Sequence, residues 1–338
     1  MAKTHALTPN VRLSRQERIM KVILAQPRGF CAGVERAIEI VEMALDKFGP
    51  PIFVRHEIVH NPHVVKRLAD KGVIFVEETD EVPEGAVIIF SAHGVAEEIE
   101  QHAKKRGLKV IDATCPLVSK VHTEGQRYVK ANREIILIGH EGHPEIEGTL
   151  GRIPGAVHLI STVEDVVKLQ IKNPDMLAYI TQTTLSVDDT KGVIDALKAR
   201  FPNIIGPATK DICYATQNRQ GAVQALAKHV DVVLVIGAHN SSNSNRLRER
   251  AEEVGVQAFL IEDATHLNPD WVKGKKTVGI TAGASAPEDL IQDLIESLKR
   301  IEPVEEVSVL PGVEENVHFR LPMSLVKAEP RTGSTSAA

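Results

Sequence analysis

Continuous apolar runs recur along the chain, and stretches with helical spacing lie between them. Five runs show almost no polar alternation: VILAQ (22–26), VIIF (87–90), IILIG (135–139), VVLVIG (232–237) and TVGIT (277–281). Strands that are buried on both faces of a parallel sheet have this pattern. AIEIVEMALDKF and DDTKGVIDALKARF instead repeat their apolar residues at helical spacing. The alternation of the two patterns predicts an α/β fold with mainly parallel sheets.

This pattern repeats three times, and each copy contains one of the three cysteines of the chain. Cys31, Cys115 and Cys213 each open a helix-like stretch, and apolar runs that end in polar loops follow it. An internal repeat of this kind decides the architecture before any local assignment does. Three thiols related by a pseudo-threefold axis would meet at one point. We therefore predict three small α/β domains in a trefoil around a central site that contains the thiols.

The repeat also suggests how the chain is divided. Its period of roughly 90 residues lies within the usual range for a small domain. Residues 301–326 follow the third copy and include a possible strand, EEVSVL, so we expect them to pack back on the first domain. The expected segments are a flexible N-terminal extension (1–20), three domains (21–113, 114–209 and 210–300), this C-terminal segment and a disordered tail (327–338).

Length, charge and the N-terminal sequence exclude several classes of protein. With 338 residues and a net charge of −5, the chain can bury a large core but lacks the basic balance of a nucleic-acid binder. No apolar run is long enough to span a bilayer. The first 20 residues lack the apolar region of a secretory signal. We therefore expect a cytoplasmic protein that binds neither nucleic acid nor membrane, with its cysteines reduced.

Each cysteine lies at or just before the start of a helix, where the helix dipole favours a thiolate. A single cysteine is more often a small buried apolar residue, but three in one register favour a metal centre. Structural zinc usually takes four ligands with short local pairs, so zinc is the weaker alternative. Three isolated thiolates suit a [4Fe–4S] cluster better. One iron would then lack a protein thiolate and stay open to a substrate.

Six polar loops, two in each copy, follow the predicted strands. In parallel sheets, loops at the carboxyl ends of strands form the ligand site. The run NSSNSN (240–245) has more hydroxyl and amide groups than a helix cap needs, so we favour a phosphate-type anion site over capping alone. The residues that these loops would direct to the centre are His60, His93, His143, Thr183, Thr184, Ser241, Ser242, Asn243 and Ser285.

The loop HEGHPEIEG (140–148) is the strongest candidate for acid–base chemistry. His143 and Glu145 could form a short proton relay beside the open iron. The spacing differs from the H-E-x-x-H of zinc proteases, and Pro144 interrupts a helix there. A carboxylic acid held near neutrality could protonate a leaving oxygen. The alternative is a polar loop without chemistry.

Taken together, these segments resemble one known family. The stretches that carry the resemblance are PRGFCAGVERAI, RHEIVHN, FSAHGV, DATCPLV, IGHEGHPEIEGT, YITQTTLSVDDT, DICYATQNRQ, NSSNSNRL and TAGASAP, in this order, over roughly residues 21 to 322. They are similar to the 4-hydroxy-3-methylbut-2-enyl diphosphate reductase (IspH/LytB) family, which acts last in the methylerythritol phosphate route to isoprenoids. One departure is His239, where many members have a lysine.

The resemblance implies a reaction and a role for each motif residue. The reaction would be reductive removal of the allylic hydroxyl of (E)-4-hydroxy-3-methylbut-2-enyl diphosphate, giving isopentenyl and dimethylallyl diphosphate. Cys31, Cys115 and Cys213 would ligate one [4Fe–4S] cluster per chain. Glu145 would deliver protons to the departing hydroxyl, with His143 and Thr183 as further catalytic residues. The substrate-binding residues would be His60, His93, His143, Thr183, Ser241, Ser242, Asn243 and Ser285.

The sequence contains no G-x-G-x-x-G dinucleotide motif and no flavin signature, so the electrons must come from a partner. We expect ferredoxin or flavodoxin with its reductase. Two other interpretations remain. One is a non-catalytic sensor or RNA-binding regulator that carries a cluster, which the acidic charge disfavours. The other is a hydro-lyase that uses the open iron without redox change, and dependence of turnover on a reductant would distinguish it.

Overall fold

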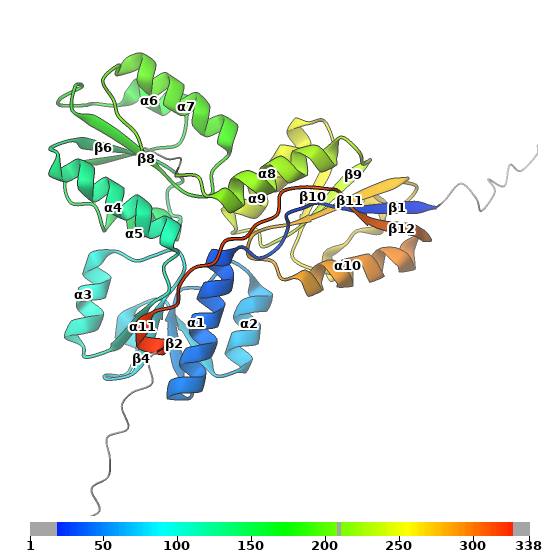
Figure 1. The fold of residues 1–338 in the computed structure, drawn as a ribbon, viewed down its shortest axis with the longest axis horizontal. Helices are drawn as coiled ribbons and strands as arrows, with labels where there is room; N and C mark the ends of the chain where they lie inside the picture. Colours follow the sequence, from blue (N-terminus) through cyan, green and yellow to red (C-terminus); the bar gives the residue numbers. More distant parts are fainter. Residues whose placement is uncertain (1–18, 208–210, 327–338) are drawn as a thin grey trace, which may run out of the picture.

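The computed structural model describes residues 19–207 and 211–326. The expected tail (327–338) and residues 1–18 of the expected N-terminal extension lie outside the described residues. Three parallel sheets, each covered by helices, form three lobes around a common centre (Figure 1). The predicted fold class, an α/β protein with three small parallel sheets, is confirmed.

The first lobe contains a four-stranded sheet of order β3-β2-β4-β5. Alternate residues of each strand face opposite sides, so α1 and α2 cover one face and α3 covers the other. The elements of this lobe are α1 (Ala32–Phe48), β2 (Ile52–Arg55), α2 (Pro62–Asp70), β3 (Val73–Val76), the 3₁₀ helix η2 (Thr79–Glu81), β4 (Val87–Phe90), α3 (Glu97–Lys105) and β5 (Lys109–Asp112).

The second lobe contains a three-stranded sheet of order β7-β6-β8. α4 and α5 pack on one face, and α6 and α7 pack on the other. The elements are α4 (Pro116–Lys130), β6 (Glu134–Ile138), α5 (Pro144–Leu150), β7 (Val157–Ile160), α6 (Val163–Lys168), β8 (Leu177–Thr181) and α7 (Val187–Arg200).

The third lobe contains a five-stranded sheet of order β10-β9-β11-β1-β12. α8 and α9 cover one face and α10 covers the other. The elements are β1 (Met20–Leu24), α8 (Tyr214–Ala227), β9 (Val232–Ile236), α9 (Ser242–Glu253), β10 (Ala258–Ile261), η3 (Ala264–His266), η4 (Pro269–Trp271), β11 (Thr277–Ala282), α10 (Glu288–Ile301) and β12 (Val304–Val309). Within the described ranges, no helix is long and apolar enough to cross a membrane.

The chain segment before each cysteine pairs with the sheet of the preceding lobe. β5 leads from the first lobe to Cys115. Ile205 bridges to Ala178 of the second lobe on the way to Cys213. β1 leads from the third lobe to Cys31. The three copies are therefore connected in a cycle, and each cysteine lies at the junction between one lobe and the next.

This cyclic rule places β1 differently from the expected boundaries. A first domain of 21–113 assigns the strand to the first domain, whereas its hydrogen-bonded neighbours are β11 and β12 of the third lobe. Met20 and Val22 are fully buried there. Parallel strands need not be neighbours in sequence, because a crossover connects them. β12, from the segment 301–326 that was expected to pack on the first domain, also pairs with β1 in the third lobe. The division into domains otherwise stays a prediction.

The C-terminal segment crosses from the third lobe to the first. After β12 the chain runs past α1 and reaches α11 (Met323–Val326), drawn in red in Figure 1. On the way, Glu315 forms an ion pair with Arg219 of α8 at 3.0 Å. Arg36 of α1 donates to the carbonyl oxygen of Arg320 at 2.8 Å. Leu325 is then buried in the core of the first lobe, so this segment fastens two lobes together.

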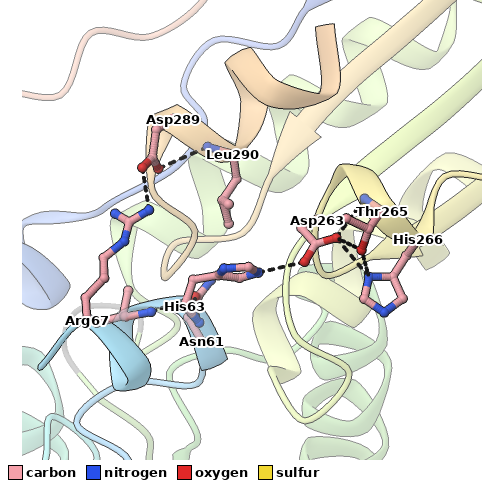
Figure 2. A network of polar contacts seen from close by, with 9 residues as sticks. Asn61, His63, Arg67, Asp263, Thr265, His266, Asp289 and Leu290 are labelled. Carbon is pink, nitrogen blue, oxygen red and sulfur yellow. Dashed lines mark hydrogen bonds and ion pairs between the residues drawn. The ribbon is translucent and has the colours of Figure 1, made fainter. Parts of the chain in front are cut away.

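A second contact joins the first and third lobes beside the centre (Figure 2). His63 of α2 contacts Asp263, which follows β10. Arg67 of α2 forms an ion pair with Asp289 of α10. His63 Nε2 lies 2.9 Å from Asp263 Oδ2. Asn61 caps α2 by accepting the amide of His63 at 3.0 Å. The start of α2 is thereby held against the third lobe.

Candidate active site

The three cysteines occupy equivalent positions in the structure. All three are helix N-caps, as predicted: Cys31 for α1, Cys115 for α4 and Cys213 for α8. Each also donates its backbone N–H to a carbonyl in the loop after a strand of the preceding lobe. The acceptors are Ala284 (3.2 Å) for Cys31, Ala92 (3.0 Å) for Cys115 and Thr183 (3.0 Å) for Cys213. These matching bonds bring the thiols to one cavity between the lobes.

Gly33 lets two of the thiols approach each other. A Cβ atom at this position would lie 2.8 Å from Cys115 Sγ and 3.8 Å from Cys31 Sγ. Any larger residue would therefore displace the Cys115 thiol. The glycine in the sequence CAGVER is needed for close approach, a requirement that its place in a helix would not reveal.

Burial outweighs the helix dipole at the thiols. It raises the pKa of Cys115 to about 12 and that of Cys213 to about 11, and it raises the pKa of Cys31 as well. The cysteines thus lie at helix N-termini as expected, but burial, which favours the thiol, outweighs the helix dipole, which favours the thiolate. At neutral pH these thiols need a bound cation to become thiolates.

The three thiols are the metal-ligating set of this cavity. Among residues 19–207 and 211–326, no three His, Cys, Asp or Glu side chains converge as one metal ion would require. The three thiols instead stand around the cavity. Iron–sulfur clusters are held by cysteine thiolates of this kind, whereas a closed zinc site needs four ligands at one point.

All ten polar residues predicted for the site line the same cavity as the thiols. They come from loops at the carboxyl ends of two strands in each lobe, which is where parallel sheets place their ligands. From the first lobe these are His60 after β2 and His93 after β4; from the second, His143 and Glu145 after β6 and Thr183 after β8; from the third, Ser241, Ser242 and Asn243 after β9 and Ser285 after β11. Thr184 also lies there.

Three of these residues form a histidine cluster. The rings of His60 and His93 stack with centroids 4.2 Å apart, and His143 meets both edge-on at 5.4 and 5.8 Å. Burial lowers the pKa of His93 well below its usual value and lowers that of His143 to about 4. These two rings are therefore neutral at pH 7. Each can still donate one N–H to an anion.

Glu145 is a buried carboxyl group held by one threonine. Its Oε1 accepts the backbone N–H of Thr183 at 2.7 Å, and its Oε2 accepts the hydroxyl of Thr183 at 2.9 Å. Burial raises its pKa to about 7 even though these bonds act in the opposite direction. The Nδ1 of His143 accepts the N–H of Glu145 at 3.1 Å, so the proton of this neutral ring is on Nε2. The cavity thus contains an acid that is half protonated near neutrality.

Several polar atoms in the cavity have no partner in the described part of the chain. Both amide atoms of the Asn243 side chain and the Nε2 of His60 are buried and unpaired. Buried polar groups are almost always hydrogen-bonded, so these atoms indicate a polar ligand. Ser241 caps α9, and Ser285 donates to the carbonyl oxygen of His60 at 2.9 Å. Within NSSNSN, Ser241 is thus the cap, and Asn243 has the unpaired amide that an anion site requires.

Sequence reasoning missed two residues that support the thiols. Arg219 is fully buried and donates to the carbonyl oxygens of Gly29 and Phe30, just before Cys31. Thr216 places its amide 3.3 Å and its hydroxyl 3.1 Å from Cys213 Sγ. The only feature of the sequence that pointed to the role of Arg219 was an arginine among the small residues of α8, because its partners lie far away in sequence.

Comparison with known proteins gives the family. The model of the LytB protein family matches residues 22–299. A protein of Bradyrhizobium diazoefficiens named 4-hydroxy-3-methylbut-2-enyl diphosphate reductase 2 is 62% identical over 306 residues, which are 90% of this chain and 99% of that protein. One from Rhodopseudomonas palustris, named 4-hydroxy-3-methylbut-2-enyl diphosphate reductase 1, is 62% identical over 91% of this chain and 100% of its own length.

Solved structures agree with the sequence relatives. The structure of the E-1-hydroxy-2-methyl-but-2-enyl-4-diphosphate reductase from Plasmodium falciparum superposes with a TM-score of 0.88 at 40% identity, covering 91% of this chain and 97% of that one. A second, described as (E)-4-hydroxy-3-methyl-but-2-enyl diphosphate reductase, the terminal enzyme of the non-mevalonate pathway, gives 0.60 at 35% identity over 83% and 100%. The predicted resemblance is confirmed: this chain belongs to the LytB family.

Proposed function

We propose that this chain is a 4-hydroxy-3-methylbut-2-enyl diphosphate reductase. It removes the hydroxyl of the allylic diphosphate and yields isopentenyl and dimethylallyl diphosphate, the last step of the non-mevalonate route. The observation that carries the proposal is the Glu145–Thr183 pair in one cavity with three thiols. An acid poised near neutrality beside a metal-ligating set suits the reductive loss of a hydroxyl group.

Cys31, Cys115 and Cys213 would hold one [4Fe–4S] cluster per chain. When bound, it supplies two electrons in single steps and an iron that lacks a protein ligand. Gly33 and Thr216 shape the pocket for it, the former by leaving space and the latter by donating to Cys213 Sγ. The buried thiols become thiolates as it binds, because the iron charge replaces their protons.

The diphosphate group would lie against the polar loops of the first and third lobes. Its oxygens only accept hydrogen bonds, and this part of the cavity offers ring N–H, hydroxyl and amide donors. Asn243 has an unpaired amide there, and α9 begins at the same loop, so its dipole favours an anion. The residues that would bind the substrate are His60, His93, His143, Thr183, Ser241, Ser242, Asn243 and Ser285.

Glu145 would deliver the proton that turns the hydroxyl into water. With its pKa at about 7, a large fraction of this group is protonated at neutral pH. Thr183 donates hydrogen bonds to both carboxyl oxygens and so fixes the orientation in which Glu145 would donate its proton. The carbon–oxygen bond breaks, two electrons enter the substrate, and a second proton adds at either end of its three-carbon allylic unit. Both products follow from that choice.

The electrons would come from ferredoxin or flavodoxin with its reductase, and the enzyme would act in the cytoplasm. An anaerobic assay with the allylic diphosphate tests the proposal. We expect both products, strict dependence on a low-potential reductant, and about four irons per chain. Turnover that needs no reductant would favour the hydro-lyase instead. Cys115→Ser should lose both iron and activity, and a variant with full iron content and full turnover would refute the ligand assignment.

A further inference from the structure

Glu57 lies in the loop between β2 and α2 and contacts two lobes. One carboxylate oxygen, Oε2, lies 3.0 Å from the Nδ1 of His60. The same oxygen accepts the side-chain amide of Asn240 at 3.0 Å. Asn240 belongs to the third lobe and directly precedes the loop of Ser241. Glu57 therefore joins a histidine of the first lobe to the polar loop of the third.

The contact with Glu57 determines what the other nitrogen of His60 can do. A carboxylate accepts a hydrogen bond, so Nδ1 carries a proton. Nε2 then either accepts, if the ring is neutral, or donates, if the ring is charged. Nε2 is buried, lines the cavity and has no partner among the described residues. A diphosphate offers acceptors only, so it requires the charged ring.

The neighbouring rings differ from His60 in this respect. His93 has its Nδ1 near the hydroxyl of Ser91 at 3.3 Å, and the Nδ1 of His143 accepts a backbone N–H. Within the described chain, Glu57 is the carboxylate bonded to a ring of this cluster. Two charged imidazoles stacked at 4.2 Å would repel each other strongly. The geometry therefore allows one positive ring, and the one with a carboxylate is His60.

We propose that Glu57 is a positioning residue that orients His60 through Nδ1 and supplies a negative charge beside it, so that Nε2 serves as a charged hydrogen-bond donor once the diphosphate is bound. This inference rests on the proposed function, because it assigns the anion to the diphosphate of the substrate. The bond to Asn240 sets the ring against the loop that carries Asn243. The hydrogen bond from His60 also lowers the pKa of Glu57, so this group is ionised at neutral pH.

The test measures binding of inorganic pyrophosphate to the anaerobic holoenzyme by calorimetry. Glu57→Gln keeps the size and one acceptor oxygen but removes the charge, and we expect binding at least about tenfold weaker. Glu77→Gln is the matched control. Glu77 is an exposed carboxylate 3.4 Å from the Nε2 of His56, so the variant removes equal charge from the neighbouring strand end. Its affinity for pyrophosphate should be unchanged.

The pH dependence of pyrophosphate binding distinguishes an effect of the Glu57 charge from a purely structural link between His60 and Asn240. The ionisable groups that face His60 are Glu57, His93 and His143, with His56 acting on Glu57. In Glu57→Gln, pyrophosphate binding should be lost at lower pH than in the wild type. A purely structural tether would weaken binding equally at every pH, and Asn240→Ala, which loses the tether alone, should show that pattern. A pH profile of Glu57→Gln parallel to that of the wild type would overturn the proposal.

Failure of this inference and failure of the proposed function give different results. If Glu57→Gln binds pyrophosphate more weakly than the wild type and loses it at lower pH, the inference stands even without turnover of the allylic diphosphate. Equal affinity in the two proteins overturns it, even where the reductase assay succeeds. A wild-type holoenzyme that does not bind pyrophosphate overturns it as well.

Discussion

Two carboxyl groups of this molecule each accept hydrogen bonds from the amide and the hydroxyl of a threonine, but their pKa values differ. Glu145 accepts from the amide and hydroxyl of Thr183, and Asp263 accepts from the amide and hydroxyl of Thr265. Burial raises the pKa of Glu145 to about 7. The partial burial of Asp263 acts in the same sense, but the bonds from Thr265 and His266 outweigh it and lower its pKa to about 2.

In this protein, the orientation of a carboxyl group and its charge at neutral pH have different causes. Thr183 donates to both oxygens of Glu145, whereas Thr265 donates both of its bonds to the Oδ1 of Asp263. Asp263 keeps contact with solvent and lies between His63 and His266, so it is an anion that joins two lobes (Figure 2). Glu145 lies in the cavity with less than a tenth of its surface exposed and has Asp211 nearby. The same type of hydrogen bonding thus accompanies an ionised carboxylate in one place and a carboxyl group with a raised pKa in the other.

The largest expected effect comes from removing the buried acid. Glu145→Gln should lower kcat by about 10²–10⁴-fold, because the amide cannot donate a proton to the leaving hydroxyl. The glutamine oxygen can still accept the N–H of Thr183, so iron content should be normal. Anaerobic turnover and iron analysis measure both. Asp263→Asn is the matched control and should leave kcat unchanged; equal loss in the two variants would refute the distinction.

The pH dependence of turnover follows from the same group. In the proposed reaction the protonated form of Glu145 is the donor, and burial raises the pKa of this group to about 7. Above that pH the protonated fraction falls about tenfold per unit, so kcat at saturating substrate should fall with it. A viologen reductant, whose potential does not vary with pH, keeps the electron supply constant. A flat profile between pH 7 and pH 9 would exclude Glu145 as the rate-limiting donor.

Asp263 should instead affect stability. Its folded-state pKa of about 2 lies below the unfolded value, so its contribution is present above about pH 4 and is lost as the pH falls toward 2. Asp263→Asn should therefore lower stability at neutral pH by about 2 kcal/mol. The midpoint of anaerobic thermal unfolding measures the effect. Asp293→Asn removes the same charge from an exposed position of α10 and should not shift the midpoint.

The sequence predicted the parts of this molecule that depend on local pattern. VIIF coincides with β4, the other buried runs overlap β1, β6, β9 and β11, and EEVSVL overlaps β12. β4, β6, β9 and β11 are recognisable because both of their faces are buried, which removes polar alternation, whereas β12 is mostly exposed. The cavity residues followed from one rule, that loops after parallel strands converge, and from the quoted motifs. Their individual roles stay predictions.

What could not be predicted depends on contacts between lobes. β1 was assigned to the first domain because the repeat was counted along the chain, whereas the sheets are connected cyclically. Arg219 and Glu57 were missed because their partners, Gly29 and Asn240, are 190 and 183 residues away. The pKa of Glu145 likewise depends on burial, which no local spacing reveals. Distant packing rather than sequence pattern decides which polar residues carry charge.

The smallest expected effect tests the threonine itself. Thr183→Val removes the hydroxyl bond to Glu145 and keeps the backbone N–H bond. Because that hydroxyl lowers the pKa of Glu145, its loss should move the alkaline fall of kcat to higher pH, by less than about one unit. Thr265→Val removes the equivalent bond to Asp263 and should leave the profile in place. A shift to lower pH in Thr183→Val would mean that the threonine stabilises the protonated acid, the reverse of the role inferred from the geometry.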